Sequence, residues 1–356
     1  MPRYGEEMTG QASWMDQARD AFQRGDEAAE IAALDGAIRA DRGNIVALLA
    51  MGELKRRQGD DRAAGSFYRL ALGVATQAPN VPTALHPGLQ RAEQFLASTE
   101  RAFADHLLGQ LRDAGIDARN AAPRVAQALR LLAGEQPLYL QQPNMFYFPG
   151  LAQRPFFDRS EFDWAREIEA ATDRIRSELT SLIALAADRF APYIIASPDR
   201  PPPNNPLLDK PDWGAAYLWK DGMIAEGMET LCPATLAALE RAPQPFIPDR
   251  SPLALFSRLT PGTHIQPHFG LLNTRLICHL PLIVPDGCGL RVGAETRGWR
   301  EGELLIFDDS FEHEAWNRGT SDRTILLFEI WRPDIDSDER AQLTRIFSAI
   351  DNYAEQ

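Results

Sequence analysis

Two kinds of hydrophobic spacing divide the chain, and they predict two kinds of structure. Over most of residues 1–136, apolar and small residues recur three and four positions apart, which is typical of amphipathic helices. From Leu253 onward the spacing falls to two, and short apolar runs such as "TRLICHLPLIV" alternate with turn residues. Helices followed by six or more closely spaced strands predict an α+β protein, in which helices pack outside a compact sandwich or jelly roll.

A repeat is detectable within the helical part. Gly25-Asp26 recurs as Gly59-Asp60, and this offset of 34 residues is the tetratricopeptide period. Small or apolar residues also coincide at the same offset, at positions where paired helices touch. Because two copies are fewer than the roughly three that a free-standing solenoid needs, we expect the repeats to pack on something else in the chain.

The texture of the sequence changes at about residue 137. An aromatic segment rich in proline and glycine comes first, and one long helical pattern then covers residues 162–190. A proline cluster at residues 198–212 predicts a loop without regular structure. We therefore divide the chain into a helical tetratricopeptide-like domain with linker helices, residues 1–136, and a jelly-roll domain, residues 137–356.

Composition narrows the classes of function. The net charge of −13 disfavours nucleic acid and anionic membranes as partners, because affinity for both is largely electrostatic. Three cysteines without a CxxC spacing fit reduced thiols in the cytoplasm. No apolar stretch approaches the roughly 18 residues of a membrane span, and the first residues lack a secretory pattern. We expect a cytoplasmic globular protein, in which an anionic substrate would need a local basic pocket.

Four of the six histidines, His264, His268, His279 and His313, fall in the strand region. His268 follows a strand and a Pro-Gly turn, and His313 heads another short strand, so their rings converge only if the intervening strands fold back, as in a double-stranded β-helix. A metal at the mouth of such a barrel is usually held by two histidines and a carboxylate, which is the pattern of non-heme Fe(II) oxygenases. Here Gly270 occupies the carboxylate position and supplies no ligand.

These motifs resemble those of a known family. Residues 253–334, including "PGTHIQPHFG" and "LLIFDDSFEHEAWN", resemble the aspartyl/asparaginyl β-hydroxylases, and the resemblance thins upstream to about residue 146. That family consists of Fe(II)- and 2-oxoglutarate-dependent oxygenases with a double-stranded β-helix. It binds iron through two histidines only, with glycine in the carboxylate position. The resemblance therefore implies that His268 and His313 are the iron ligands and the catalytic centre.

The resemblance also implies the contacts with cosubstrate and substrate. Ser257, His279 and Arg323 occupy the family's 2-oxoglutarate positions, whereas a further cosubstrate arginine of better-known members falls on Ile277. A planar guanidinium suits the distal carboxylate of the oxoacid. Arg275 occupies the position that meets the substrate's acidic side chain, and an unpaired arginine in a cavity is costly unless an anion arrives. Alternatively, a nearby acid such as the first aspartate of "FDDS" pairs with it permanently.

Acidic residues surround His313. Asp308 and Asp309 can accept a hydrogen bond from the imidazole nitrogen that faces away from the metal, or hold a metal-bound water, and we assign Asp309 to the water. The plain structural alternative is an Asp-Asp turn that caps a short helical segment. Glu312 and Glu314 alternate with His313 along a strand, so we expect them to face solvent.

Three hypotheses follow for the function. The first is an oxygenase that uses Fe(II), 2-oxoglutarate and O2 to hydroxylate the β-carbon of an aspartyl or asparaginyl unit in an acidic small molecule, peptide or protein. The second keeps the reaction and takes a lipid acyl chain, which the aromatic segment "MFYFPGLAQRPFF" could line. The third is a non-catalytic tetratricopeptide adaptor fused to a cupin-like barrel. In each case the repeats either recruit a protein partner or support the barrel.

Overall fold

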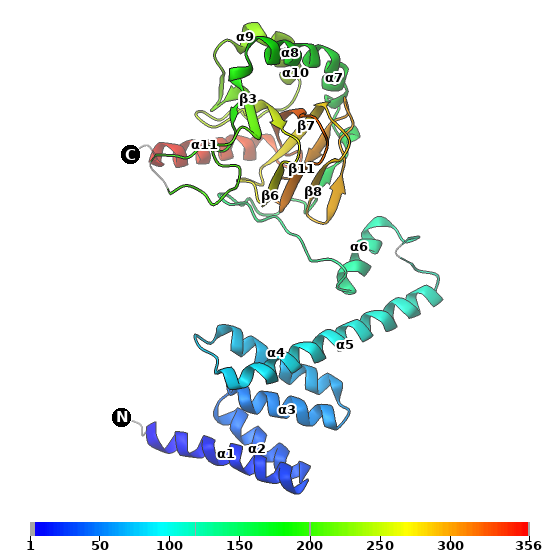
Figure 1. The fold of residues 1–356 in the computed structure, drawn as a ribbon, viewed down its shortest axis with the longest axis vertical. Helices are drawn as coiled ribbons and strands as arrows, with labels where there is room; N and C mark the ends of the chain where they lie inside the picture. The colour runs from blue at the N-terminus through cyan, green and yellow to red at the C-terminus, as the bar shows by residue number, and fades with distance from the viewer. Residues whose placement is uncertain (1–3, 118, 199–200, 355–356) are drawn as a thin grey trace. The chain divides into compact units, whose positions relative to one another are not determined.

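Two units make up the chain. The structure, a computed structural model, describes residues 4–117, 119–198 and 201–354. Contacts divide it into two compact units, Met1–Pro137 and Leu138–Gln356 (Figure 1).

The N-terminal unit is built from α-helices that pack in sequence. Their bounds are α1 Tyr4–Arg24, α2 Glu27–Ala40, α3 Ile45–Arg57, α4 Asp61–Gln77, α5 His86–Asp113 and α6 Pro123–Leu132. Two-residue and three-residue connections after α1 and α3 make each of the first two pairs a helical hairpin. Small side chains keep the axes close: a Cβ added at Gly52 would lie 2.5 Å from the ring of Tyr68.

The 34-residue offset has a counterpart in the backbone of the two hairpins. Gly25 and Gly59 follow α1 and α3 with φ of +71° and +74°, a left-handed conformation that glycine adopts without strain. Asp26 and Asp60 then cap the next helix, each accepting a hydrogen bond from the backbone N–H three residues on. The repeat ends before α5. This helix packs its buried Ala92 and Leu96 against α4.

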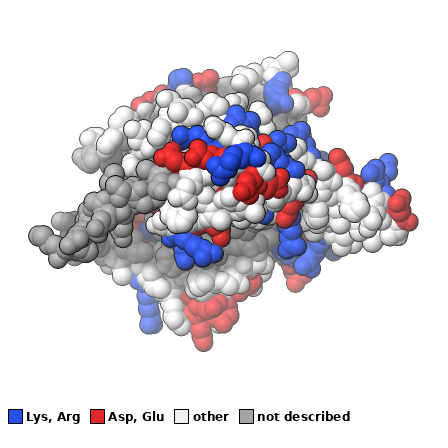
Figure 2. Space-filling view, turned by 90° about the horizontal axis from the view of Figure 1, so that it is seen from below, with Lys and Arg blue, Asp and Glu red and all other residues white. Residues whose placement is uncertain are grey.

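The surface carries charges of both signs. Figure 2 shows Lys and Arg side chains interspersed with Asp and Glu on the face that it presents. Within the helices of the N-terminal unit, some oppositely charged side chains pair one helical turn apart, such as Arg56 with Glu53 at 2.7 Å. Exposed pairs of this kind contribute at most about 1 kcal/mol each to stability, so the folding of the hairpins rests on their apolar core.

The C-terminal unit is a jelly roll made of eight consecutive strands. Their bounds are β5 Ala254–Leu259, β6 His264–His268, β7 Arg275–Ile283, β8 Cys288–Val292, β9 Glu295–Arg297, β10 Leu305–Phe307, β11 His313–Asn317 and β12 Arg323–Trp331. One sheet has the order β10-β7-β12-β5 and the other β6-β11-β8-β9. Because the chain passes from one sheet to the other as it proceeds, the strands wind as a double-stranded β-helix, which confirms the predicted fold of this part.

Short strands extend the larger sheet on both sides. At one edge β1 Phe156–Phe157 pairs with β10, and at the other β3 Trp213–Lys220 pairs with β5, followed by β2 Ala191–Pro192 and β4 Met223–Ile224. The helices α7 Ala165–Ala170, α8 Thr172–Leu185, α9 Met228–Leu231 and α10 Pro233–Leu239 share a core with this sheet, and α11 Ser337–Ala354 ends the described chain (Figure 1). The larger sheet is therefore covered by helices on its outer face.

Alternation along β7 decides which side chains reach the core and which reach the barrel interior. Leu276, Cys278 and Leu280 are fully buried in the core shared with the helices. The residues between them, including Ile277 and His279, face the other way, toward the smaller sheet. The strand thus carries the packing of the domain on one face and polar chemistry on the other.

The helical pattern over residues 162–190 was predicted as one helix, and this is wrong. The structure breaks it at Ala171 into α7 and α8, with short 3₁₀ turns at either end of the segment. At the break the Ala171 N–H bonds to the carbonyl of Ile168, and the Thr172 hydroxyl donates to the carbonyl of Glu169 at 2.6 Å. Local bonds of this kind replace the regular helical ladder and end α7.

A fully buried ion pair joins two loops of the jelly roll. Asp308 and Arg332 both have 0% exposed surface, and Asp308 also accepts hydrogen bonds from Gln141 and from the N–H and hydroxyl of Ser310. Asp308, the first aspartate of the Asp-Asp turn, therefore stabilises the fold. The turn closes on Ser310 and Arg332, and no helical segment follows it.

Replacing Arg332 by methionine keeps most of its volume and leaves the carboxylate of Asp308 buried without its countercharge. We expect the free energy of unfolding to fall by about 3–5 kcal/mol. Urea unfolding followed by tryptophan fluorescence measures this, because six of the seven tryptophans lie in the C-terminal unit. Arg300→Met, at a side chain that is 83% exposed, is the matched control and should change stability by less than about 0.5 kcal/mol. Equal stabilities of the two variants would contradict the prediction.

Candidate active site

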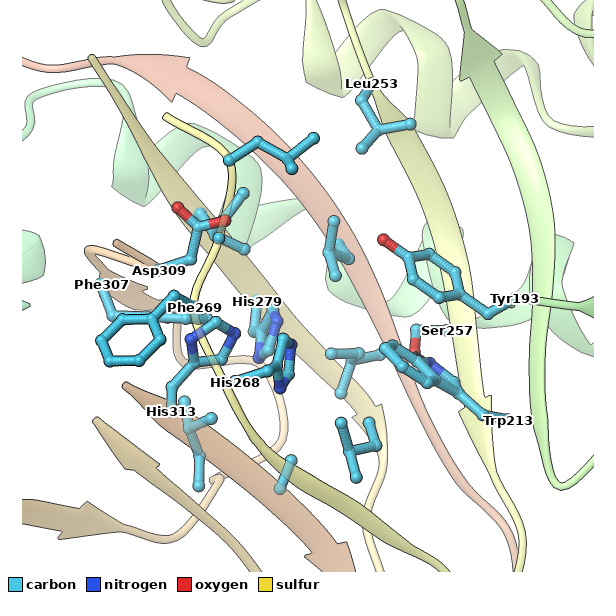
Figure 3. Close-up of a pocket in the computed structure, with 18 of the residues that line it drawn as sticks. Tyr193, Trp213, Leu253, Ser257, His268, Phe269, His279, Phe307, Asp309 and His313 are labelled. Carbon is cyan, nitrogen blue, oxygen red and sulfur yellow. Dashed lines mark hydrogen bonds between the residues drawn. The ribbon is translucent and has the colours of Figure 1, made fainter. Parts of the chain in front are cut away.

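A cavity of about 310 Å³ lies between the two sheets of the jelly roll. Its walls come from eight strands, β3, β5, β6, β7, β8, β10, β11 and β12, and from the segment that follows β2. Figure 3 shows His268, His313 and His279 on one side of it, and Tyr193 and Trp213 on the other. All the residues that the sequence singled out as ligands or contacts line this one cavity: Ser257, His268, Arg275, His279, Asp309, His313 and Arg323.

His268 and His313 are brought together by strand pairing. His268 is the last residue of β6, His313 is the first of β11, and the two are direct partners in the antiparallel ladder. Their ring centroids lie 4.1 Å apart. Residues 45 positions apart in the sequence thus meet at one end of the smaller sheet, because β7 to β10 fold back between them.

Backbone carbonyls fix the tautomer of both rings. The Nδ1–H of His268 donates to the carbonyl of Gln266 at 2.8 Å, and that of His313 donates to the carbonyl of Phe311 at 3.0 Å. A carbonyl only accepts, so Nδ1 carries the proton and Nε2 keeps a lone pair for a metal. Of the two roles that the sequence offered for Asp308 and Asp309, that of acceptor for His313 is not used, because the main chain two residues back already serves that nitrogen.

Both imidazoles are neutral at physiological pH. Burial, together with the neighbouring His268, lowers the pKa of His313 to about 3. Burial likewise lowers the pKa of His268, although its hydrogen bond to the Gln266 carbonyl partly opposes this. A histidine must be neutral to bind a metal. Both rings already are, so neither has to lose a proton when a cation binds.

Asp309 fills the space that a side chain at position 270 would need. A Cβ added to Gly270 would lie 2.2 Å from Oδ2 of Asp309, which is far closer than real contacts allow. The Asp309 carboxylate is buried, and its Oδ1 has no hydrogen-bond partner among the described residues. Burial raises the pKa of Asp309 to about 6, while the nearby Arg275 opposes the shift. The carboxylate beside the two histidines is therefore that of Asp309, which follows β10, and not one at position 270.

The cavity wall also holds a buried arginine. Arg323 begins β12, is 1% exposed, and forms no ion pair within the described ranges; its Nε and Nη1 lack hydrogen-bond partners there. Its guanidinium lies over the ring of Trp299 at 4.9 Å. Burial lowers the pKa of Arg323 to about 10, so the group is still charged at neutral pH. A desolvated cation without a countercharge is a receptor for an anion.

Ser257 and His279 accompany Arg323 in the cavity wall. The indole N–H of Trp213 donates to the Ser257 hydroxyl at 3.2 Å, and that of Trp299 donates to Nδ1 of His279 at 3.3 Å. Nδ1 of His279 therefore accepts, which leaves its Nε2–H free to donate. Burial and the charge of Arg323 lower the pKa of His279 well below its ordinary value, so its ring is neutral. Ile277 lies in the same wall and adds only apolar surface.

Arg275 is paired, which corrects the idea of an unpaired cation that waits for an acidic substrate. Its guanidinium bonds to the fully buried carboxylate of Glu329 and lies 3.4 Å from Oδ2 of Asp309. Burial on its own would lower the pKa of Arg275, but these two carboxylates raise it. The alternative of a permanent acidic partner holds, with Glu329 rather than Asp308, because β12 places residue 329 beside β7.

We expected Glu312 and Glu314 to face solvent, but the structure shows that both form ion pairs. Both pair with Arg291, which β8 brings opposite Glu314 in the ladder, and Glu314 also bonds to His264 at 2.6 Å. These side chains form a charged network on the outer side of the smaller sheet. His264 is thus engaged outside the cavity, unlike the other three strand histidines.

Sequence reasoning missed Tyr193, Trp213 and Glu329. Glu329 carried a signal, because it is the lone acid inside the apolar run "TILLFEIW". Tyr193 and Trp213 carried none, since both come from the segment between the helices and the jelly roll, where no periodicity marks a strand wall.

Two imidazoles with free Nε2 atoms can hold a divalent cation, and Arg323 in the same cavity suits an anionic ligand of that cation. Within the described ranges, no group of three or more His, Cys, Asp and Glu side chains is arranged to hold a metal. None of the helices described is long and apolar enough to cross a membrane.

Comparison with known proteins gives consistent matches to the jelly-roll unit. Residues 169–333 match the family model described as aspartyl/asparaginyl beta-hydroxylase. The human and mouse proteins of that name are 32% and 40% identical over 209 residues, which is 58% of this chain and 26% and 27% of theirs. An ornithine lipid ester-linked acyl 2-hydroxylase from Rhizobium tropici is 33% identical over 186 residues, 51% of this chain and 62% of that protein. The chain thus spans about a quarter of the length of the two mammalian relatives.

Proposed function

The jelly-roll unit of this chain belongs to the aspartyl/asparaginyl beta-hydroxylase family, and we propose that it is an Fe(II)- and 2-oxoglutarate-dependent hydroxylase. The observation that carries this proposal is the pairing, in one cavity, of two metal-ready imidazoles with a buried guanidinium that lacks a countercharge. His268 and His313 would hold the iron, and Arg323 would bind the distal carboxylate of 2-oxoglutarate.

The chemistry that the bound iron and cosubstrate supply is the oxidative decarboxylation of 2-oxoglutarate by O2, coupled to hydroxylation of a C–H bond. The protein supplies binding, orientation and exclusion of water. Arg323 offers a planar fork of donors for a carboxylate. Ser257 and the Nε2–H of His279 flank the same ligand, and Trp213 and Trp299 fix both side chains by hydrogen bonds.

Asp309 has a separate role in this proposal. Its Oδ1 lacks a partner within the described chain, and its carboxylate stands where a third protein ligand would begin. We assign it to a water in the metal's coordination shell, which it would hold by accepting a hydrogen bond. Ile277 replaces a further cosubstrate arginine of better-known family members. Arg323 therefore carries more of the anchoring of 2-oxoglutarate here.

The substrate class that we favour is an aspartyl or asparaginyl side chain, in agreement with the family description. Lipid acyl chains are a second class, because the acyl 2-hydroxylase from Rhizobium tropici is similar over half of this chain. The aromatic segment proposed to line an acyl site does not line the cavity: residues 145–157 supply none of its walls. That placement favours an amino-acid side chain.

The test is an anaerobic titration of the purified protein with Fe(II) and 2-oxoglutarate. Wild-type protein should develop a weak visible absorption band of the ternary complex, and in air it should release succinate. Neither signal should appear with His268→Ala. A wild-type protein that gives no band and no succinate would refute the hydroxylase and leave the adaptor hypothesis. Products formed from asparaginyl peptides, aspartyl peptides and acyl lipids would then separate the substrate classes.

The helical hairpins of the N-terminal unit are proposed to be tetratricopeptide-like and to recruit a peptide or protein substrate. Matching turn geometry at the 34-residue offset supports this. Removal of residues 1–110 separates recruitment from support. A lower turnover on a protein substrate with unchanged turnover on a short peptide would favour recruitment, and lower solubility with unchanged turnover on both would favour support.

A further inference from the structure

Tyr193 is held rigidly in the cavity wall opposite the three histidines. It follows β2, and its backbone N–H donates to the carbonyl of Trp213 at 2.8 Å. Its ring stacks on the indole of Trp213 with centroids 4.1 Å apart and an angle of 20° between the planes. Trp213 is itself fixed by its hydrogen bond to Ser257. The position of the phenol is therefore set by two contacts with Trp213, one through the backbone and one through the ring.

The hydroxyl of Tyr193 is directed into the cavity. Figure 3 shows its oxygen pointing away from the strand that carries Trp213 and toward the open space in front of the histidines. Tyr193 is half-buried, and no described residue forms a hydrogen bond with its hydroxyl, which is therefore available to a ligand in the cavity. Burial raises the pKa of Tyr193, so the group remains protonated and can donate. A bound molecule would satisfy it.

The charges near this hydroxyl differ from those around Arg323. Arg275, Asp309 and Glu329 are the charged groups that act on Tyr193, and the two carboxylates already neutralise the guanidinium. One cation with two acids gives this end of the cavity no spare positive charge. A carboxylate placed here would meet Asp309, whereas no described acid pairs with Arg323.

We propose that Tyr193 determines substrate specificity by donating a hydrogen bond to a neutral carbonyl of the substrate, so that this chain selects a carboxamide over a carboxylate. This inference rests on the proposed hydroxylase function and narrows its substrate to the asparaginyl type. A carboxamide offers an oxygen to the phenol and N–H donors to a neighbouring carboxylate such as Asp309. A carboxylate offers only acceptors, and it is repelled by the same group.

The experiment uses the full chain loaded anaerobically with Fe(II) and 2-oxoglutarate, with N-acetyl-asparagine amide and N-acetyl-aspartate amide as matched probes. Calorimetric titration at pH 7.5 should give a Kd for the asparagine probe at least about tenfold below that for the aspartate probe. Tyr193→Phe should remove this difference and leave the affinity for 2-oxoglutarate within about twofold of wild type. Tyr217→Phe, in β3 and outside the cavity lining, is the control and should preserve the difference.

The outcomes separate the two proposals. If the wild-type protein forms no absorption band with Fe(II) and 2-oxoglutarate, the hydroxylase function itself fails. If the band forms but the aspartate probe binds as well as the asparagine probe, the specificity proposal alone is overturned. Binding of neither probe to a protein that forms the band overturns it too, as does an equal loss of affinity for both probes in Tyr193→Phe.

Discussion

His313→Ala should lose Fe(II) binding and hydroxylation together, by more than the roughly 10- to 100-fold that the loss of a residue merely supporting a ligand causes. The reason is the number of protein ligands. The proposed site has two imidazoles, His268 and His313, and the position that usually supplies a carboxylate is Gly270. With one imidazole removed, a single protein ligand would be left to hold the ion. Iron affinity is measured anaerobically by titration, and turnover by succinate release.

The matched control for this variant is His264→Ala. His264 belongs to β6, as His268 does, but its side chain bonds to Glu314 on the outer side of the sheet. Its loss should leave iron affinity within about twofold of wild type. If His313→Ala binds Fe(II) as tightly as His264→Ala, the metal does not lie where the two rings converge.

Gly270→Asp should damage the site although it adds the carboxylate that ordinary members of the oxygenase class carry. The new Cβ would begin 2.2 Å from Oδ2 and 2.3 Å from Cγ of Asp309, so one of the two side chains must move. Overpacking of this kind costs about 1–3 kcal/mol, and here two carboxylates also share one buried space. We expect lower stability of the metal-free protein and a loss of most of the succinate release.

Adding a second substitution, Asp309→Gly, should restore much of the stability that Gly270→Asp removes. In the doubly substituted protein the carboxylate starts from position 270 and the space that Asp309 filled is empty, so the coupling free energy between the two changes should be at least about 1 kcal/mol. Gly298→Asp is the control, because a Cβ there meets nothing within 4 Å. Additive effects of the two substitutions would show that positions 270 and 309 do not compete for the same space.

The sequence predicted the jelly roll well because its signals are local. Alternation of apolar residues in β7 and β12 and turn residues between the strands were readable directly, and the spacing of the histidines required the strands to fold back. The sequence indicated helical structure within residues 162–190 but not the break at Ala171, since only the hydroxyl of Thr172 marks that position. Helical periodicity continues across the break and hides it.

For the candidate site, residue identities were easier to predict than their partners. The partner of Arg275 is Glu329, 54 residues away on a strand that pairs with β7, and no local pattern can express such a contact. The acceptor for His313 is a main-chain carbonyl, which every residue carries and no sequence singles out. Tyr193 enters the cavity from irregular chain, where spacing gives no direction to a side chain.

The two faces of β7 limit how this protein can change over time. On one face Arg275, Ile277 and His279 line the cavity. On the other face Leu276, Cys278 and Leu280 pack in the core that the sheet shares with the helices. Insertion or deletion of a single residue in β7 would exchange its two faces. His279 would then point into the hydrophobic core, and a leucine would point into the cavity. Descendants of this chain can therefore acquire new specificities by replacing side chains one at a time along this strand, but its length and phase are inherited unchanged.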